Sequence, residues 1–158
     1  MTDPATRPSR FPWPPVIYLV AIAVSIVLWL LYPLPWFGSP LSDILFAVGC
    51  VMIVAVIGID ISAMRTLARA NTTIRPDKAS THLVTTGAFS FSRNPIYLAN
   101  TLIMLGAALI AGIAWFIPLA LIAAFLTQKL AIEGEEKHLA LRFGKKYQDY
   151  RKRVRRWI

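Results

Sequence analysis

Four long apolar segments, separated by shorter polar connections, dominate the pattern of this chain. Their approximate limits are residues 16–34, 41–63, 96–110 and 112–130. Each approaches the roughly 20 residues with which a helix crosses a hydrocarbon core about 30 Å thick, although the third segment is the shortest. The pattern predicts an all-α integral membrane protein, with residues 1–158 forming a single domain of about four transmembrane helices.

Small residues occur in the last two apolar segments, which are separated only by a short connection around Gly112. Gly106 in the third segment and Ala120 in the fourth are of the kind that lets helix backbones approach closely. These two segments are therefore predicted to form a tight antiparallel hairpin.

The chain after the fourth apolar segment has a helical repeat. Apolar and aromatic side chains recur at steps of three and four residues: Leu139, Phe143, Tyr147, Tyr150, Val154 and Trp157. This spacing predicts an amphipathic helix over residues 133–157, with Gly144 as a candidate break and a strongly basic opposite face. Two placements are open, because such a helix could lie on the membrane surface or fold back as a lid over the central loop.

Composition and charge narrow the class of protein. Hydrophobic residues make up 56% of the 158 residues and the mean hydropathy is +0.56, which is too apolar for a soluble domain of this size. All 17 lysines and arginines lie before the first segment, between the second and third, or from Lys129 onward. The chain is predicted to cross the inner cell membrane several times. By the positive-inside rule, both termini and the active site are predicted on its cytoplasmic side. Anionic membrane lipids then account for the net charge of +9, and we expect no nucleic-acid partner.

Cysteine and histidine are scarce. Cys50 is the only cysteine and lies in the second apolar segment, so a disulfide within one chain is excluded. The two histidines, His82 and His138, are not spaced with carboxylates as metal ligands are. We therefore expect no metal site.

The central loop, residues 81–97, is the only long polar connection between apolar segments. Gly87 permits a turn that a side chain would hinder, and Pro95 suits the first position of a new helix. The N-terminal amides of that helix would attract anionic groups, and Phe89 and Tyr97 offer flat faces to a purine or a cation. These features suit a small zwitterionic nucleotide-like ligand, although a plain interfacial hairpin with aromatic anchors explains them equally well.

Several polar residues lie at or inside the predicted membrane boundary. Asp60 could pair with Arg65 or Arg93 or reach a polar cavity. The simpler interpretation is that Asp60 lies at the membrane interface in contact with water. Asn100 lies inside the third segment and is expected to face the helix bundle, with an interhelical hydrogen bond as its default role and a substrate contact as the alternative.

Two adjacent carboxylates, Glu135 and Glu136, begin the C-terminal helix. Carboxylates beside a basic region usually form salt bridges. Their predicted proximity to the Arg93 loop gives them a second role as ligands for a cationic amine or for ribose hydroxyls.

Residues 65–158 carry a series of motifs in a fixed order. They are Leu83-Val-Thr-Thr-Gly-Ala-Phe, Ser92-Arg-Asn-Pro-Ile-Tyr, the pair Glu135-Glu136, and Phe143-Gly-x-x-Tyr147-x-x-Tyr150. In this order the motifs resemble the isoprenylcysteine carboxyl methyltransferase and phospholipid methyltransferase superfamily, and the chain is similar in size to its short bacterial members.

The resemblance implies an integral membrane enzyme that uses S-adenosylmethionine, held between the central loop and the C-terminal helix. The cofactor contacts carried over by position are Thr81, His82, Leu83, Val84, Phe89, Asn94, Pro95, Ile96, Tyr97 and Glu135. Candidate substrate contacts are Arg93, Asn100, Lys129 and Glu136. No residue is assigned as catalytic.

The chain departs from the prenylcysteine enzymes at two positions. Asn94 stands where they generally have histidine, and Ala131 stands where they have a substrate-contacting arginine. The nearby Lys129 is a candidate replacement for that arginine. The expected acceptor is a lipophilic or lipidated membrane molecule, foremost a carboxylate of the isoprenylcysteine type. A phospholipid amine and a noncatalytic membrane scaffold are the alternatives.

Overall fold

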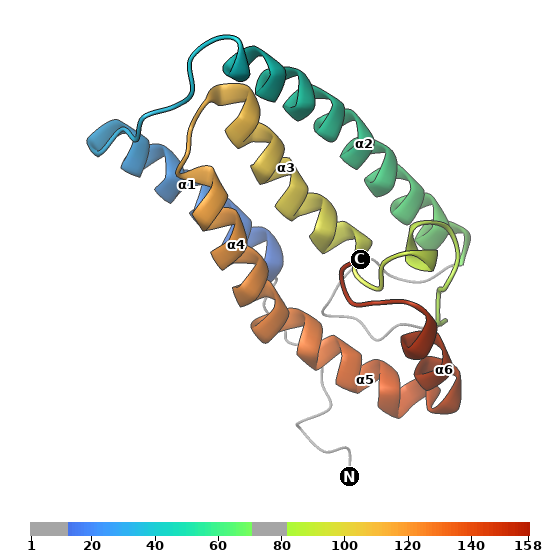
Figure 1. Ribbon diagram of the computed structural model, residues 1–158. Helices are drawn as coiled ribbons and strands as arrows, with labels where there is room; N and C mark the ends of the chain where they lie inside the picture. Colours follow the sequence, from blue (N-terminus) through green and yellow to red (C-terminus); the bar gives the residue numbers. More distant parts are fainter. Residues whose placement is uncertain (1–12, 71–81) are drawn as a thin grey trace.

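The structure is a computed structural model that describes residues 13–70 and 82–158, and all regular elements in these ranges are helical (Figure 1). The helices are α1 (Trp13–Leu31), α2 (Leu41–Arg69), the 3₁₀ helix η2 (Gly87–Ser90), α3 (Pro95–Ala111), α4 (Phe116–Thr127), the π-helix η3 (Gln128–Ile132), α5 (Glu133–Phe143) and α6 (Lys145–Arg153). The predicted all-helical class is confirmed for the described residues.

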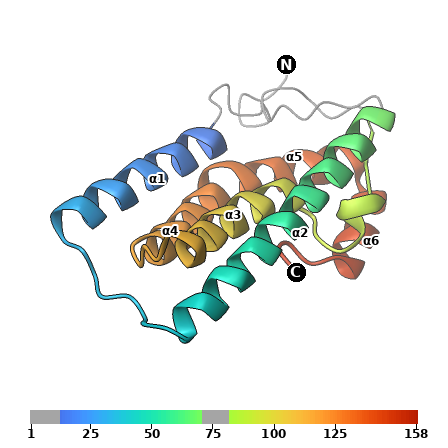
Figure 2. The same cartoon turned by 90° about the horizontal axis from the view of Figure 1, so that it is seen from above.

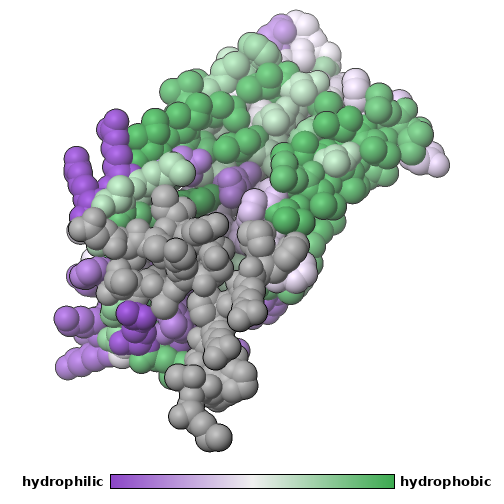
Figure 3. All heavy atoms as spheres, turned by 180° about the vertical axis from the view of Figure 1, so that it is seen from behind, coloured by the Kyte–Doolittle hydropathy of each residue, from purple (hydrophilic) through white to green (hydrophobic). Residues whose placement is uncertain are grey.

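Three helical stretches are long and apolar enough to cross a membrane. They are Trp13–Leu31, Leu41–Arg69 and the continuous run Phe116–Phe143, whereas α3, at 17 residues, is a shorter apolar helix. On the face that Figure 3 shows, hydrophobic residues cover much of the surface toward one end of the molecule, and most of the strongly hydrophilic ones gather toward the other. The chain therefore has the build of a multi-pass membrane protein.

Helix α3 lies between α2 and α4 and packs on both (Figure 2). Helix α1 packs mainly on α4. Two glycines bring α2 and α3 together. A Cβ atom on Gly49 would lie 2.9 Å from the Gly106 carbonyl oxygen, and one on Gly106 would lie 2.7 Å from Ile53 Cδ1. Gly106 thus serves the contact with α2, not the expected contact with α4.

The predicted hairpin between the third and fourth segments is present and is packed through alanines. Gly112 ends α3 with φ +67°, a conformation that side chains rarely adopt, and α4 begins at Phe116. Ala108 and Ala120 have no exposed surface in the core that α3 and α4 share with α1. Close backbone approach at these alanines explains the tight connection.

The C-terminal region breaks at the expected candidate, Gly144, but it is not helical through residue 157 as predicted. Helix α5 continues α4 without interruption through η3, and Gly144, at φ +49° and ψ −122°, separates α5 from α6. Helix α6 ends at Arg153, where Val154 adopts an extended conformation. Residues 154–158 then return to the N-terminal end of α3 (Figure 1), so this terminal segment is not part of a helix.

Candidate functional site

The central loop lies close against α2 because the residue at the contact, Gly87, has no side chain. Gly87 has φ +60°, and a Cβ atom there would collide with Thr66 Oγ1 of α2. The 3₁₀ helix η2, which begins at Gly87, is thereby packed on the end of α2. The local sequence explains this placement, because only glycine combines a positive φ with so close an approach.

Helix α6 packs against the other side of the loop. Leu83 lies against a buried cluster formed by Tyr147, Tyr150 and Val154. The Tyr150 hydroxyl donates a hydrogen bond of 2.7 Å to the Phe89 carbonyl, and burial raises the pKa of Tyr150, which keeps it a neutral donor. Of the two placements open from the sequence, the C-terminal region takes the one folded over the loop.

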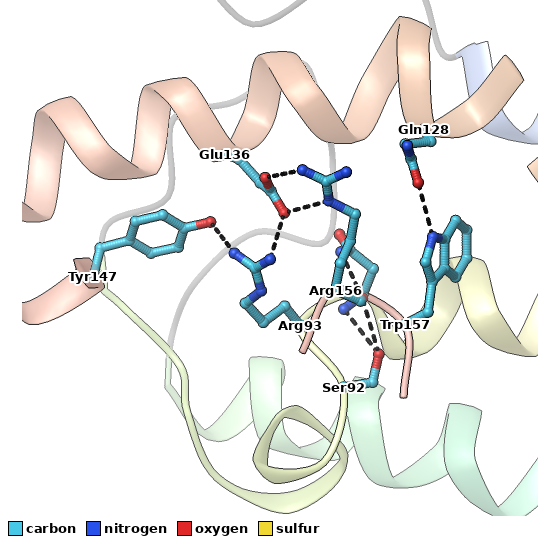
Figure 4. Close-up of polar contacts among 8 residues, drawn as sticks. Ser92, Arg93, Gln128, Glu136, Tyr147, Arg156 and Trp157 are labelled. Carbon is cyan, nitrogen blue, oxygen red and sulfur yellow. Dashed lines mark hydrogen bonds and ion pairs between the residues drawn. The ribbon is translucent and has the colours of Figure 1, made fainter. Parts of the chain in front are cut away.

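Glu136 is the centre of a buried ionic network (Figure 4). Its two carboxylate oxygens accept hydrogen bonds of 3.0 and 2.8 Å from Arg156, and Arg93 lies 3.2 Å away on the opposite side. Arg93 also donates to the Tyr147 hydroxyl at 3.2 Å. The side chains of Arg93 and Glu136 are only 8% and 12% exposed, so the carboxylate compensates two cations with little help from water.

The terminal segment is bound to the start of α3 through its backbone. The Arg156 carbonyl accepts hydrogen bonds from the Asn94 side-chain amide at 3.0 Å and from the Ser92 hydroxyl at 3.4 Å. The Arg93 amide donates to the Arg155 carbonyl at 3.0 Å. Asn94, which the resemblance assigns to the cofactor, therefore holds the C-terminus in this structure.

Trp157 joins the terminal segment to the π-helix. Its indole N–H donates to the Gln128 side-chain oxygen at 2.9 Å (Figure 4). Gln128 is the first residue of η3, and single π-turns within α-helices are frequent at functional sites. Sequence reasoning missed Arg156, Trp157 and Gln128, because the heptad-like spacing placed Trp157 on a helix face.

Glu135 points to a different set of partners from its neighbour Glu136. The Tyr97 hydroxyl donates to Glu135 at 3.4 Å, and Glu135 forms no ion pair with the described cations. The Tyr97 carbonyl accepts from Thr101 and Tyr18, whose hydroxyls lie 2.6 Å apart. A carboxylate and a phenol supported by α1 and α3 can together hold an ammonium group or a pair of hydroxyls.

Asp60 and Asn100 are half-buried, and their side chains make no hydrogen bond or ion pair with other residues in the described ranges. Among the described residues, Asp60 forms no ion pair with Arg65 or Arg93, the two partners considered from the sequence. Arg93 is bound to Glu136 instead. Asp60 follows Gly49 by eleven residues, three helical turns, and so lies on the face of α2 toward α3. The expected interhelical bond of Asn100 is likewise not formed.

The direction of Asn100 follows from its neighbours on α3. Thr101 points to α1, because it bonds Tyr18, whereas Ala99 lies two turns before Gly106 and so faces α2. At about 100° per residue, Asn100 lies between these two directions. Its side-chain amide therefore points neither directly at α2, as Ala99 does, nor at Tyr18 of α1, as Thr101 does.

Lys129 does not approach the loop as a replacement for the family arginine. Its ammonium group pairs with Glu133 at 2.8 Å, and the two side chains are 49% and 33% exposed. Ala131, at the position of that arginine, is buried. The candidate site therefore lacks a cation from this part of the helix.

The remaining expected contacts fall in two groups. His82, Leu83, Val84 and Phe89 lie on the loop between α2 and α6, whereas Asn94, Pro95, Ile96 and Tyr97 lie at the start of α3 near Glu135. Thr81 is outside the described residues. Within residues 13–70 and 82–158, no three histidine, cysteine or acidic side chains lie together as a group that could hold a metal ion.

One comparison with known proteins gave a match. The family model described as phospholipid methyltransferase matches residues 44–146, from the start of α2 to the start of α6. Neither the curated proteins nor the solved structures gave a significant match. The matched range includes the central loop, Tyr97 and both glutamates.

Proposed function

Because the chain belongs to the phospholipid methyltransferase family, we propose that it transfers a methyl group from S-adenosylmethionine to a lipophilic acceptor in the membrane. The observation that carries the proposal is the family match across the loop and α5, which contain Tyr97 and Glu135. Methyl transfer is an in-line displacement at carbon, so alignment of the two reactants is the main requirement.

The cofactor would lie where the loop, the start of α3 and α5 meet. Glu135 has no cationic partner among the described residues and is available to the ammonium group or the ribose hydroxyls of the cofactor. Tyr97 would orient that carboxylate. The other proposed contacts are Thr81, His82, Leu83, Val84, Phe89, Asn94, Pro95 and Ile96.

The charges around the site favour an amine as the acceptor. Arg93 is bound to Glu136, and Lys129 is bound to Glu133, so neither is available to a substrate carboxylate. Asp60 and Glu135 are acidic groups without a cationic partner in the described chain. This balance supports the ammonium group of an aminophospholipid over the carboxylate of an isoprenylcysteine, which the sequence had favoured.

An amine acceptor requires one proton transfer. The nitrogen would have to lose a proton to free its lone pair, and S-adenosylmethionine, held near Tyr97 and Glu135, would supply the methyl group. Asp60 or Glu135 would accept that proton, directly or through water. Asn100, a half-buried amide with no side-chain hydrogen bond to another described residue, would contact the headgroup of a lipid that enters sideways from the membrane.

The acceptor can be identified with methyl-labelled S-adenosylmethionine and the purified chain in lipid. Phosphatidylethanolamine, a prenylcysteine analogue and a mixture of soluble metabolites are offered separately. We expect label in the phosphatidylethanolamine headgroup, and Asp60→Asn should lower this incorporation at least about tenfold if Asp60 takes the proton. Label in the prenylcysteine ester would instead support the carboxylate acceptor, and label only in soluble products would contradict the membrane-embedded one.

The proposed orientation places the loop, both termini and the site in the cytoplasm, on the inner face of the cell membrane. In a chain with Cys50 replaced, single cysteines at Ser39 and Ser90 test it, because Ser39 precedes α2 and Ser90 is exposed on the central loop. We expect an impermeant thiol reagent to label Ser39→Cys from outside intact cells and Ser90→Cys only after lysis. Labelling of both from the same side would contradict this topology.

A further inference from the structure

A groove lies along the outer face of α2. It has a volume of about 860 Å³ and is bounded by the C-terminal half of α2 and by loop residues 83–87. Arg65 and Arg69 follow Gly49, which faces α3, by 16 and 20 residues, so at about 100° per residue they point away from α3. The groove is therefore separate from the face of α2 that carries Asp60.

The lining of the groove changes in polarity along α2. Gly58 and Ile61 form the apolar end, Ser62 and Thr66 add hydroxyl groups, and Arg65 and Arg69 provide the charge at the end of the helix. At 1.5 Å per residue, Gly58 and Arg69 are about 16 Å apart along the axis. A phospholipid presents groups in the same order over a similar length: acyl chain, ester oxygens and phosphate.

Two features mark the groove as unfilled by the residues that the structure describes, 13–70 and 82–158. Arg65 and Arg69 are exposed and form no ion pair with the residues that the structure describes. A Cβ atom on Gly58 would meet no other atom within 4 Å, so the apolar end has open space beside the helix. Basic side chains at a membrane surface attract anionic lipid, and two arginines can bind one phosphate through several N–H groups.

We propose that this groove binds one anionic phospholipid as a bound lipid that is not methylated. The phosphodiester would lie between Arg65 and Arg69, and an acyl chain would pass along Ile61 and Gly58. The bound lipid would contact loop residues 83–87, whose Leu83 packs on the α6 cluster of Tyr147, Tyr150 and Val154. It would thus stabilise the loop from the side opposite α6.

The purified chain, stripped of lipid in a mild detergent, allows a direct test by native mass spectrometry. Phosphatidylglycerol, phosphatidylcholine and inorganic phosphate are added separately. We expect one phosphatidylglycerol to be retained in preference to phosphatidylcholine, and the double change Arg65→Gln and Arg69→Gln to weaken this retention by about 30-fold. Equal retention of the two lipids, or no effect of the double change, would overturn the proposal.

A second variant separates a shaped lipid site from general surface charge. Gly58→Leu fills the apolar end without changing any charge. The added side chain should not disturb the fold, because nothing lies within 4 Å of a Cβ atom at this position. It should also weaken phosphatidylglycerol retention, whereas Arg151→Gln, a charge change at an exposed position of α6, should not. Retention that Arg151→Gln lowers as much as the α2 changes do would indicate charge alone. Displacement of the lipid by millimolar inorganic phosphate would identify a site for free phosphate instead.

Discussion

Glu136→Ala is expected to lower the free energy of unfolding by about 3–5 kcal/mol, the usual cost of removing one partner from a buried ion pair. The side chains of Arg93 and Glu136 are 8% and 12% exposed, so the substitution leaves a largely buried guanidinium whose one remaining side-chain partner among the described residues is the Tyr147 hydroxyl. Arg156 would lose both of its side-chain hydrogen bonds to Glu136. Reversible unfolding in mixed detergent micelles would measure the difference.

The matched control for this prediction is Glu133→Gln on the same helix. Glu133 also binds a cation, Lys129 at 2.8 Å, but these side chains are 33% and 49% exposed. Water and salt screen an ion pair of this kind, so it contributes little to stability and this variant should unfold close to the unmodified protein. Equal losses for the two variants would show that burial of the Glu136 network does not govern its contribution.

Glu135→Gln should weaken S-adenosylmethionine binding by about tenfold to a hundredfold, because a hydrogen bond to a charged group contributes about 1.5–3 kcal/mol. The amide is nearly the same size as the carboxylate and can still accept from Tyr97, so the fold should be retained. Calorimetric titration in lipid with the cofactor and with its demethylated product would measure the effect. The unmodified chain should bind both ligands and should not bind NADPH.

Two controls accompany the Glu135 experiment. Glu133→Gln lies two residues earlier on the exposed side of the same helix, and Lys152→Gln lies on the exposed face of α6. Both should leave cofactor affinity nearly unchanged. Unaltered affinity in Glu135→Gln would remove this residue from the proposed site, and no binding by the unmodified chain would favour a noncatalytic scaffold.

The sequence distinguished the parts of the site but not their partners. The Glu135-Glu136 pair was recognisable as two carboxylates with two potential roles, as salt-bridge partners or as ligand-binding groups. Adjacent residues on a helix point about 100° apart, so the two glutamates face different neighbours. The packing of α5 decides which of them forms salt bridges. Glu136 meets Arg93 and Arg156, whereas Glu135 meets Tyr97.

The terminal segment illustrates the limit of periodicity. The spacing of apolar side chains predicted one helix through Trp157, and it does place Tyr147 and Tyr150 on the face that packs against the loop. Beyond Arg153 the chain is extended, and its backbone bonds to Ser92, Arg93 and Asn94. Partners more than 60 residues away in the chain leave no periodic signal, so this return could not be predicted.

The amino-acid sequence by itself determined the helical membrane class, the polar loop, the break at Gly144 and the family motifs, because hydropathy, turn preference and charge distribution are local properties. Only the tertiary structure decided that Gly106 packs on α2, that Lys129 is occupied by Glu133, and that Asn94 holds the C-terminus. These outcomes depend on which helices become neighbours and how each is rotated about its axis. That choice is made by the packing of the whole bundle and not by any one segment.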